Sequence, residues 1–267
     1  MPPIVRMLAS KLKALALSNG MILSRTTEPA KLVRFLEAVK PTKTNSNLVR
    51  IGGDGDGGYL VPDDLDGIQA CFSPGVSDIA TFEQDLVDRG IRCFLADHSV
   101  DRPPIQHRLI EFEKKFLGPV DRDEFMTLES WVSRKVAGEN DFILQMDIEG
   151  AEYGVISDTS RATLRRFRIL VIEFHGLDAL CDKGGFELIN LTFAKLLADF
   201  EVVHIHPNNC FSAVRCNGFL IPPLMEFSFL RKDRISTSER RTDFPHELDR
   251  ASLMDRPDYA LPDCWFR

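Results

Sequence analysis

The stretch from Asp141 to Ile156, DFILQMDIEGAEYGVI, constrains the fold of this chain more than any other. It opens with a nearly continuous apolar run, which is typical of a strand buried on both faces of a parallel sheet. Three carboxylates follow, those of Asp147, Glu149 and Glu152, and the small residues between them permit a tight turn into a helix. Ligands of open α/β sheets bind beyond the carboxyl ends of the strands, so a ligand or a reaction is expected at these acids.

The same acids also have a purely structural interpretation. Glu149 and Glu152 stand at the first turn of the following helix, where carboxylates favour the helix dipole and face water. Asp147 ends a buried strand, so this interpretation suits it less well. The sequence alone leaves both roles open for the two glutamates.

Composition limits the class of protein. The chain has 267 residues, enough for one large α/β domain, and 27% of them are charged, as in ordinary soluble proteins. A net charge of −7 argues against broad affinity for nucleic-acid phosphates, so no nucleic-acid partner is expected. Six cysteines without a Cys-x-x-Cys pair indicate neither a disulfide framework nor a zinc site, and a cytoplasmic location fits them best.

Three segments are predicted along the chain. Residues 1–45 form a helical extension, residues 46–235 the main domain, and residues 236–267 a charged surface tail. The apolar stretches of the first segment are too short to span a bilayer, which takes about 20 apolar residues. We expect an amphipathic helix packed on the domain, and contact of this helix with a membrane surface is the alternative.

A glycine-rich segment, LVRIGGDGDGGYLVPDD, occupies residues 48–64. It lacks the Lys and the Ser or Thr of a phosphate loop, and the Gly and Glu that an EF-hand requires at fixed places. The segment is therefore either a hairpin loop or a flap that lets the backbone approach a ligand, with Tyr59 at its edge.

The next segment predicts a strand–turn–helix–strand unit of the kind that binds nucleotides at its first turn. The strands are residues 68–72 and 91–99, and Gly75 is the only glycine in the first turn. A dinucleotide site requires G-x-G-x-x-G, so that a helix N-terminus meets the pyrophosphate. The missing glycines disfavour an NAD-dependent or nucleotide-sugar enzyme, which remains an alternative.

The motif DIEGAE, residues 147–152, closely resembles the signature of the FkbM-type methyltransferases, which use S-adenosylmethionine. The segments SPGVSDIATFE and LADHS support this resemblance, which covers residues 48–230. A first motif with the usual dense glycines is absent. The resemblance implies a Rossmann-like class I methyltransferase fold: a mostly parallel seven-stranded sheet with an antiparallel last strand and helices on both faces.

The resemblance also implies a cofactor site. S-adenosylmethionine has no phosphate and so does not need the dense glycine loop. Asp97, at the end of the second strand, is implied to accept hydrogen bonds from the ribose hydroxyls, and Glu83 matches an acid often found in the first motif. The whole set expected to bind the cofactor is Ser73, Pro74, Gly75, Glu83, Asp97, His98, Asp147, Glu149 and Tyr59.

The remaining elements follow from periodicity and turn signals. We expect helices over residues 103–116, 127–135 and 186–200, strands over 168–174 and 201–205, and a short strand near Gly118 and Val120. Residues 219–230 form a long apolar element without a preceding helix, which suits the antiparallel last strand of class I methyltransferases.

Polar side chains at the ends of three strands are the candidates for catalysis. They are Asp147, Glu173 with His175, and His206 with Asn208. Methyl transfer requires alignment of the acceptor and removal of its proton, and an imidazole suits the role of base near neutral pH. His175 is the first candidate for this base and His206 the second.

A divalent metal such as Mg²⁺ could act instead of a base. Asp147 and Glu173, with Asn208 or a histidine, would supply oxygen and nitrogen ligands for it. The expected activity is O-methylation of a hydroxyl on a sugar, a glycan or a secondary metabolite. A non-catalytic cofactor-binding module with the same fold is the remaining alternative.

Overall fold

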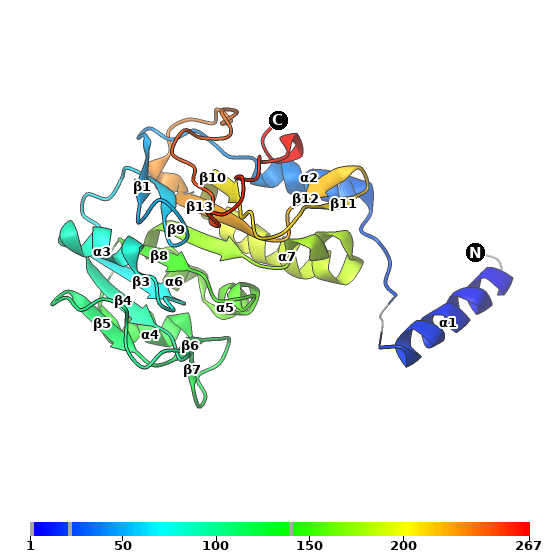
Figure 1. Cartoon of the computed structure of the whole chain (residues 1–267), viewed down its shortest axis with the longest axis horizontal. Coiled ribbons are helices and arrows are strands. Elements are labelled where there is room, and N and C mark those ends of the chain that lie inside the picture. The colour runs from blue at the N-terminus through cyan, green and yellow to red at the C-terminus, as the bar shows by residue number, and fades with distance from the viewer. Residues whose placement is uncertain (1–2, 21–22, 139–140) are drawn as a thin grey trace.

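The computed structural model describes residues 3–20, 23–138 and 141–267. A seven-stranded sheet forms its centre, in the order β10-β13-β9-β8-β3-β4-β5 (Figure 1). These strands are β3 (Ala70–Pro74), β4 (Arg92–Ala96), β5 (Ile110–Glu113), β8 (Phe142–Met146), β9 (Phe167–Phe174), β10 (Phe200–Pro207) and β13 (Met225–Arg231). Neighbouring strands are parallel except at β13, which runs antiparallel to both β9 and β10. The fold class expected from the sequence is confirmed.

The central strands are buried on both faces, which explains their continuous apolar sequence. Side chains alternate across a strand, so Phe142, Leu144 and Met146 of β8 join one core while Ile143 joins the other. The larger core contains Trp131 and many phenylalanines, and the smaller one contains mostly aliphatic side chains. Two separate cores thus fix the register of the sheet from both sides.

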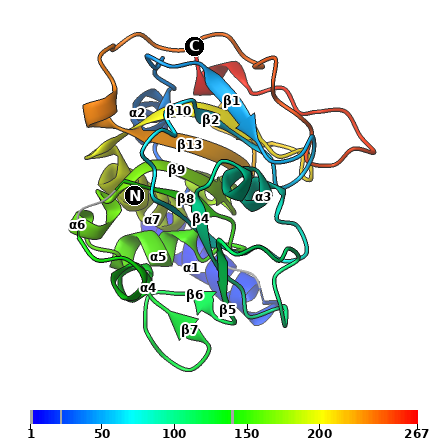
Figure 2. The same ribbon diagram turned by 90° about the vertical axis from the view of Figure 1, so that its left-hand side faces the viewer.

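Helices cover both faces of the sheet. One face packs against α2 (Pro29–Val39), α4 (Leu128–Lys135), α5 (Glu152–Asp158), α6 (Arg161–Leu164), α7 (Lys183–Leu197), and the short helices η1 (Leu177–Cys181) and η3 (Asp263–Trp265). The other face packs against α3 (Thr81–Asp88) and the hairpin of β1 (Leu48–Ile51) and β2 (Tyr59–Pro62). Figure 2 shows α4 and α5 on one side of β8 and β4, and α3 on the other. The hairpin confirms one of the two structures considered for the glycine-rich segment.

The helix expected over residues 103–116 is wrong. Described residues 98–109 form turns and irregular chain, β5 follows, and Phe116 begins β6 (Phe116–Leu117), which pairs with β7 (Phe125–Met126). Pro103 and Pro104 remove backbone donors and disfavour a helical conformation before them. The alternating sequence IEFE then pairs with β4 as the edge of the sheet.

The long apolar element at residues 219–230 is two strands rather than one. Pro222 and Pro223 separate β12 (Phe219–Ile221) from β13, because proline cannot donate to a sheet ladder. β12 pairs with β11 (Val214–Cys216) in a separate ribbon, and β13 alone enters the central sheet. The short helix η2 (Lys232–Arg234) follows β13.

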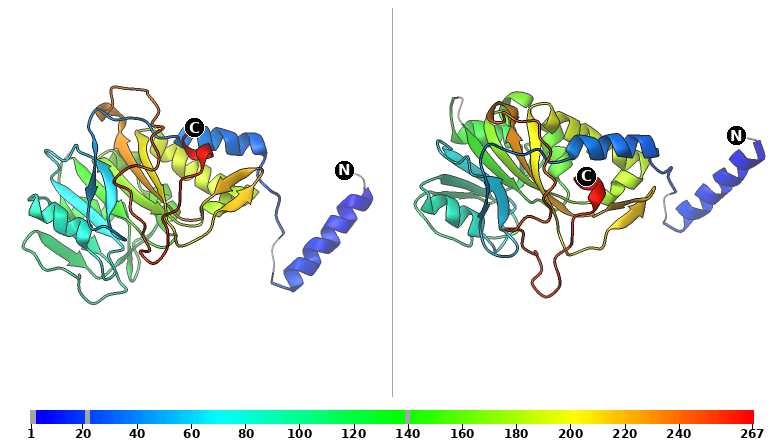
Figure 3. Two further views of the ribbon diagram at one scale, coloured as in Figure 1. Left: turned by 45° about the horizontal axis from the view of Figure 1, so that its top comes forward. Right: turned by 90° about the horizontal axis from the view of Figure 1, so that it is seen from above.

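The two flanking segments differ from expectation in opposite ways. The helix α1 (Pro3–Ser18) lies apart from the domain, so its expected packing on the domain is wrong (Figure 3). The end of the charged tail instead enters the larger core, where Trp265 is fully buried. The expectation of a surface tail is therefore wrong for its last residues. No helix in the described ranges is long and apolar enough to cross a membrane.

Candidate active site

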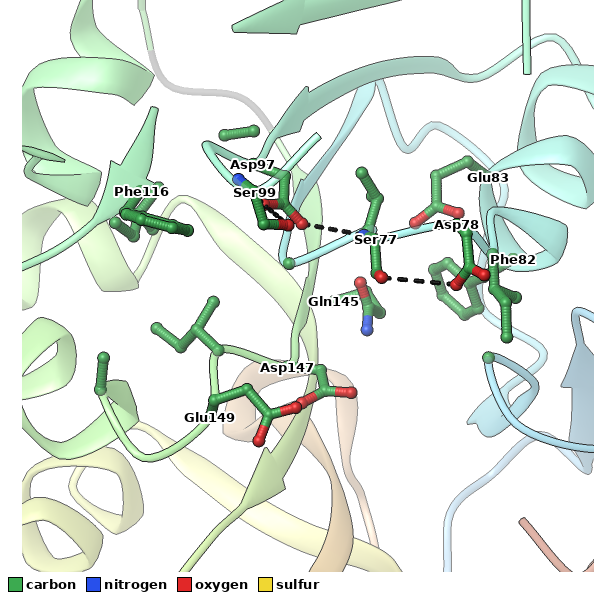
Figure 4. A pocket seen from close by; sticks show the side chains of 18 of the residues that line it. Ser77, Asp78, Phe82, Glu83, Asp97, Ser99, Phe116, Gln145, Asp147 and Glu149 are labelled. Atoms are coloured by element: carbon green, nitrogen blue, oxygen red, sulfur yellow. Dashed lines mark hydrogen bonds between the residues drawn. The ribbon is translucent and has the colours of Figure 1, made fainter. Parts of the chain in front are cut away.

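A cavity of about 620 Å³ opens at the carboxyl ends of β3, β4 and β8 (Figure 4). The turns after these strands form its walls, and the glycine-rich loop between β1 and β2 contributes Asp56 and Gly57. Phe116 and Phe125, whose ring centroids are 5.7 Å apart, close another side. The cavity therefore lies where the open α/β sheet predicted a ligand site.

Most of the expected cofactor residues meet in this cavity. Those that line it are Tyr59, Gly75, Glu83, Asp97, Asp147 and Glu149. Three others lie beside it without appearing in the described lining. Ser73 is buried and hydrogen-bonded to Glu83, Pro74 ends β3, and the His98 ring packs 5.1 Å from that of Phe116.

Gly75 brings two strand ends into contact. Its φ is +89°, and a Cβ at this position would stand 1.6 Å from the carbonyl oxygen of Asp147. Its N–H donates to the carbonyl oxygen of Ala96, 2.9 Å away. A residue with a side chain would push the first turn away from β8, so a glycine is necessary at this position.

Asp97 presents a fixed carboxylate at the end of β4. Its Oδ2 accepts the N–H of Ser77 at 2.8 Å, and its Oδ1 accepts the N–H and the hydroxyl of Ser99 at 2.7 and 2.6 Å. Two carboxylate oxygens offer about four acceptor sites, so Oδ2 retains capacity for a ligand hydroxyl. Figure 4 shows these bonds beside the cavity.

A chain of buried polar groups runs along the cavity from Glu83 to Tyr59. The Ser73 hydroxyl lies between Glu83 and Gln145, and Gln145 Nε2 donates to the Tyr59 hydroxyl at 3.3 Å. Burial raises the pKa of Glu83 to about 6, partly offset by the bond from Ser73. Burial also raises the pKa of Tyr59 well above its usual value, so its phenol stays neutral.

Gln145 was not predicted to belong to the site. It interrupts an otherwise apolar strand, and a buried amide needs hydrogen-bond partners, so its position in β8 is the signal that identifies it. Ser77, Asp78 and the two phenylalanines of β6 and β7 also line the cavity without having been predicted.

His175 is held in one orientation by Glu152. Glu152 is fully buried, and its Oε1 lies 3.1 Å from Nδ1 of His175. The same oxygen accepts the N–H groups of Ile148 and Gly150, which caps the turn before α5. Glu152 therefore does not face water, whereas the Glu149 side chain is 88% exposed.

The other nitrogen of His175 faces two acids of the cavity. Nε2 lies 3.8 Å from Asp147 and 3.4 Å from Glu149. Burial, helped by the Glu149 charge and opposed by His175, raises the pKa of Asp147 to about 7. Burial lowers the pKa of His175, but Glu152, Asp147 and Glu149 outweigh it, and the net pKa is raised.

Asp147, Glu149 and His175 could also hold a metal ion. Their ligand atoms lie within 4.8 Å of one another, as oxygen and imidazole ligands of a divalent cation would. This set differs from the expected pair of Asp147 and Glu173. The Glu173 carboxylate accepts a hydrogen bond from Asn208 Nδ2 at 2.9 Å.

His206 lies in a different environment from His175. Its Nε2 is 3.1 Å from Asp258 and its Nδ1 is 3.4 Å from Glu226. Burial lowers its pKa, but the charges of Glu226 and Asp258 raise it to about 10. Neither histidine is in the described cavity lining, but Nε2 of His175 lies beside two acids that are, Asp147 and Glu149. His206 would stay protonated at neutral pH, so His175 is the better placed candidate base.

The cavity is strongly acidic. Its carboxylates are those of Asp56, Asp78, Glu83, Asp97, Asp147 and Glu149. Among the described residues that line it, none is a lysine or arginine. Such a site favours a cationic ligand and disfavours the phosphates of a dinucleotide.

Residues 120–191 match the family model of the methyltransferase FkbM domain, which confirms the resemblance seen in the sequence. The match includes β8, the acids after it and His175. No curated protein matches the chain.

Two solved structures are similar at low identity. A chain of the crystal structure of a fibrillarin/Nop5p complex is 10% identical, with a TM-score of 0.38, over 62% of this chain and 74% of that chain. The 23S rRNA methyltransferase ErmE is 12% identical, with a TM-score of 0.35, over 80% of this chain and 72% of that chain. Neither TM-score is high enough to support a statement about the reaction of this chain.

Proposed function

We propose that this chain, a methyltransferase that uses S-adenosylmethionine according to its FkbM domain match, methylates a hydroxyl oxygen on a sugar, a glycan or a secondary metabolite. The proposal rests on one observation. An acidic cavity, with Asp97 at the end of β4 in its wall, lies next to His175, whose ring is oriented by a contact with Glu152. A hydroxyl acceptor is favoured because it must lose a proton, which His175 is placed to take.

The cavity residues suit the cofactor. S-adenosylmethionine, when bound, supplies a methyl group on a positively charged sulfur and carries no phosphate. Oδ2 of Asp97 would accept a hydrogen bond from a ribose hydroxyl, and the surrounding carboxylates would favour the positive charge of the cofactor. The same carboxylates would repel the phosphates of NAD or of a nucleotide sugar, which weakens that alternative.

The acceptor site is proposed at the His175 side of the cavity. Nε2 of His175 would remove the proton of the acceptor hydroxyl, while Glu152 accepts a hydrogen bond from Nδ1–H and fixes the ring. Asp147 and Glu149 would stabilise the imidazolium that forms, since both lie near Nε2. A base so placed contributes about 10²- to 10⁴-fold to the rate.

Cofactor binding is tested first by isothermal titration of the purified chain with S-adenosylmethionine, with NAD as the matched control. Binding of S-adenosylmethionine alone supports the proposal, and binding of NAD alone contradicts it. Acceptor screening then follows with free sugars, glycans and hydroxylated metabolites, each assayed for transfer of a labelled methyl group.

The role of His175 is tested with His175→Ala. We expect kcat to fall by about 10²- to 10⁴-fold while the affinity for S-adenosylmethionine is unchanged. His107→Ala is the matched control, because His107 lies in the loop before β5 and outside the described cavity lining. Full activity of His175→Ala would exclude His175 as the base. Binding of S-adenosylmethionine without methyl transfer by the wild type to any acceptor would favour a non-catalytic module.

A metal-assisted reaction is the second candidate, favoured by the grouping of Asp147, Glu149 and His175. A divalent ion there would lower the pKa of the acceptor hydroxyl, and His175 would be a ligand rather than a base. Turnover after treatment with EDTA distinguishes the two. Undiminished turnover supports a reaction with His175 as the base, and a loss of turnover that Mg²⁺ restores supports the metal-assisted reaction.

A cytoplasmic location, suggested by the six free cysteines, remains part of the proposal.

A further inference from the structure

The helix α1 presents an apolar surface that no other described part of the protein covers. Its exposed large apolar side chains, 53–68% accessible, are Met7, Leu8, Leu12, Leu15 and Leu17. Leu8, Leu12 and Leu15 recur at the spacing that places side chains on one face of a helix. An isolated helix of 16 residues is marginal in water, so a partner is expected to cover this face.

The catalytic domain is not that partner in this structure. Figures 1 and 3 show α1 lying apart from the sheet and from the helices that cover it. Within the described ranges, the hydrogen bonds of Ser18, Asn19 and Gly20 return to α1 itself. No described hydrogen bond or ion pair joins residues 3–20 to the rest of the chain.

Charge distinguishes α1 from the domain. The helix contains Arg6, Lys11 and Lys13 and no acidic residue, whereas the whole chain carries a net charge of −7. The rest of the chain therefore carries −10 once these three positive charges are removed. Lys11 and Lys13 are exposed. Positive charge beside an apolar face is the pattern of a helix that lies on an anionic bilayer.

A second copy of α1 fits this pattern less well. Two paired helices would bring like charges together with no acid on either helix to offset them. The helix also spans little more than two heptads, and a coiled coil is usually indicated by three to four. An anionic lipid surface satisfies both the apolar face and the charge.

We propose that α1 binds the surface of an anionic phospholipid bilayer, with Leu8, Leu12 and Leu15 in the interface, and thereby holds the catalytic domain at a membrane. The proposal does not depend on the identity of the methyl acceptor. It places the lysines at the level of the lipid head groups and the leucines among the first acyl carbons.

Sedimentation with vesicles tests it, using the full chain and vesicles of phosphatidylcholine with or without phosphatidylglycerol. We expect binding only to the vesicles that contain phosphatidylglycerol, weakening as salt rises. The double substitution Lys11→Gln and Lys13→Gln should weaken binding roughly 30-fold, since each charge near the surface contributes about 1 kcal/mol. Leu12→Glu with Leu15→Glu should weaken it at least about tenfold.

The control is Leu188→Glu with Leu191→Glu, a pair of exposed leucines on α7, which should bind like the wild type. Equal binding of the Leu12/Leu15 variant and the wild type would overturn the proposal. A fall in the unfolding temperature of that variant would show that α1 packs on its own domain instead. A change from dimer to monomer in that variant, without vesicle binding by the wild type, would show that a second copy covers the face.

Discussion

Oε1 of the fully buried Glu152 lies 3.1 Å from Nδ1 of His175, and this contact determines which nitrogen of the histidine faces the cavity acids. A buried carboxylate paired with one ring nitrogen fixes both the tautomer and the orientation of an imidazole. Glu152 also accepts two backbone N–H groups at the start of α5, so the turn and the histidine are positioned by one side chain.

Glu152→Gln should lower kcat by up to about 10²- to 10⁴-fold, because a neutral amide opposite Nδ1 does not stabilise the imidazolium that forms. It should also move the pH–rate profile to lower pH, since Glu152 raises the pKa of His175. The amide oxygen can still accept the two backbone N–H groups, so the unfolding temperature should change little. Asp158→Asn, an exposed position on the same helix, is the control. An unchanged profile would argue against the pairing.

Asp97→Asn should weaken the binding of S-adenosylmethionine. Hydrogen bonds to charged groups contribute about 1.5–3 kcal/mol, so the Kd should rise roughly 10- to 100-fold. Isothermal titration measures this directly. Asp63→Asn, an exposed aspartate just after β2, should leave the Kd unchanged. Equal affinity of Asp97→Asn and the wild type would place the ribose elsewhere.

Stability should depend on pH through Glu83. Burial raises its pKa from 4.5 to about 6, so the folded state binds the proton more tightly than the unfolded state. The resulting stabilisation is complete below pH 4.5 and is lost as the pH rises through about 6. The difference in pKa corresponds to about 2 kcal/mol.

Glu83→Gln should abolish this dependence. Relative to it, the wild type should lose about 2 kcal/mol of unfolding free energy between acidic and neutral pH, measured by urea unfolding without ligand. Asp88→Asn, exposed near the end of the same helix, should behave like the wild type. Parallel curves for Glu83→Gln and the wild type would refute the assignment.

Trp265→Ala should destabilise the domain, although Trp265 lies near the end of the chain and far in sequence from the residues of the cavity. Trp265 is fully buried, its ring packs 6.4 Å from Phe35 and 6.2 Å from Phe227, and its Nε1 donates to the carbonyl oxygen of Leu220. Loss of such a side chain costs about 3–5 kcal/mol. Met254→Ala, at a side chain that is 76% exposed, should cost less than about 0.5 kcal/mol by the same urea measurement.

The centre of the fold could be read from the sequence because its signals are local. The apolar run of β8 and the acids after it lie within sixteen residues, and Asp97 directly follows the strand pattern of β4. Gly75 was identifiable as a turn residue. Its contact with the Asp147 carbonyl oxygen depends on a parallel pairing that no local pattern specifies.

Other parts of the site depend on distant partners. The sequence around Glu152 is typical of an exposed acid in the first turn of a helix. In the structure, the end of β9 places His175 beside it. The position of His206 at a strand end predicts a candidate base. In the structure it pairs instead with Asp258, which lies 52 residues later in the chain. Trp265 is in a charged tail by composition, and its core contacts come from Phe35 of α2 and Phe227 of β13, both distant in the sequence. Interactions between segments so far apart produce no periodic pattern in the sequence, so they could not be predicted from it.

The position of β13 has a consequence for synthesis of the protein. β9 and β10 do not pair with each other, since β13 lies between them and bonds to both. A nascent chain that has emerged from the ribosome only through β10 therefore has an unpaired edge on β9 and no place for β10 in the sheet. Such open edges invite aggregation, so this chain should rely on chaperones until residues 225–231 are available.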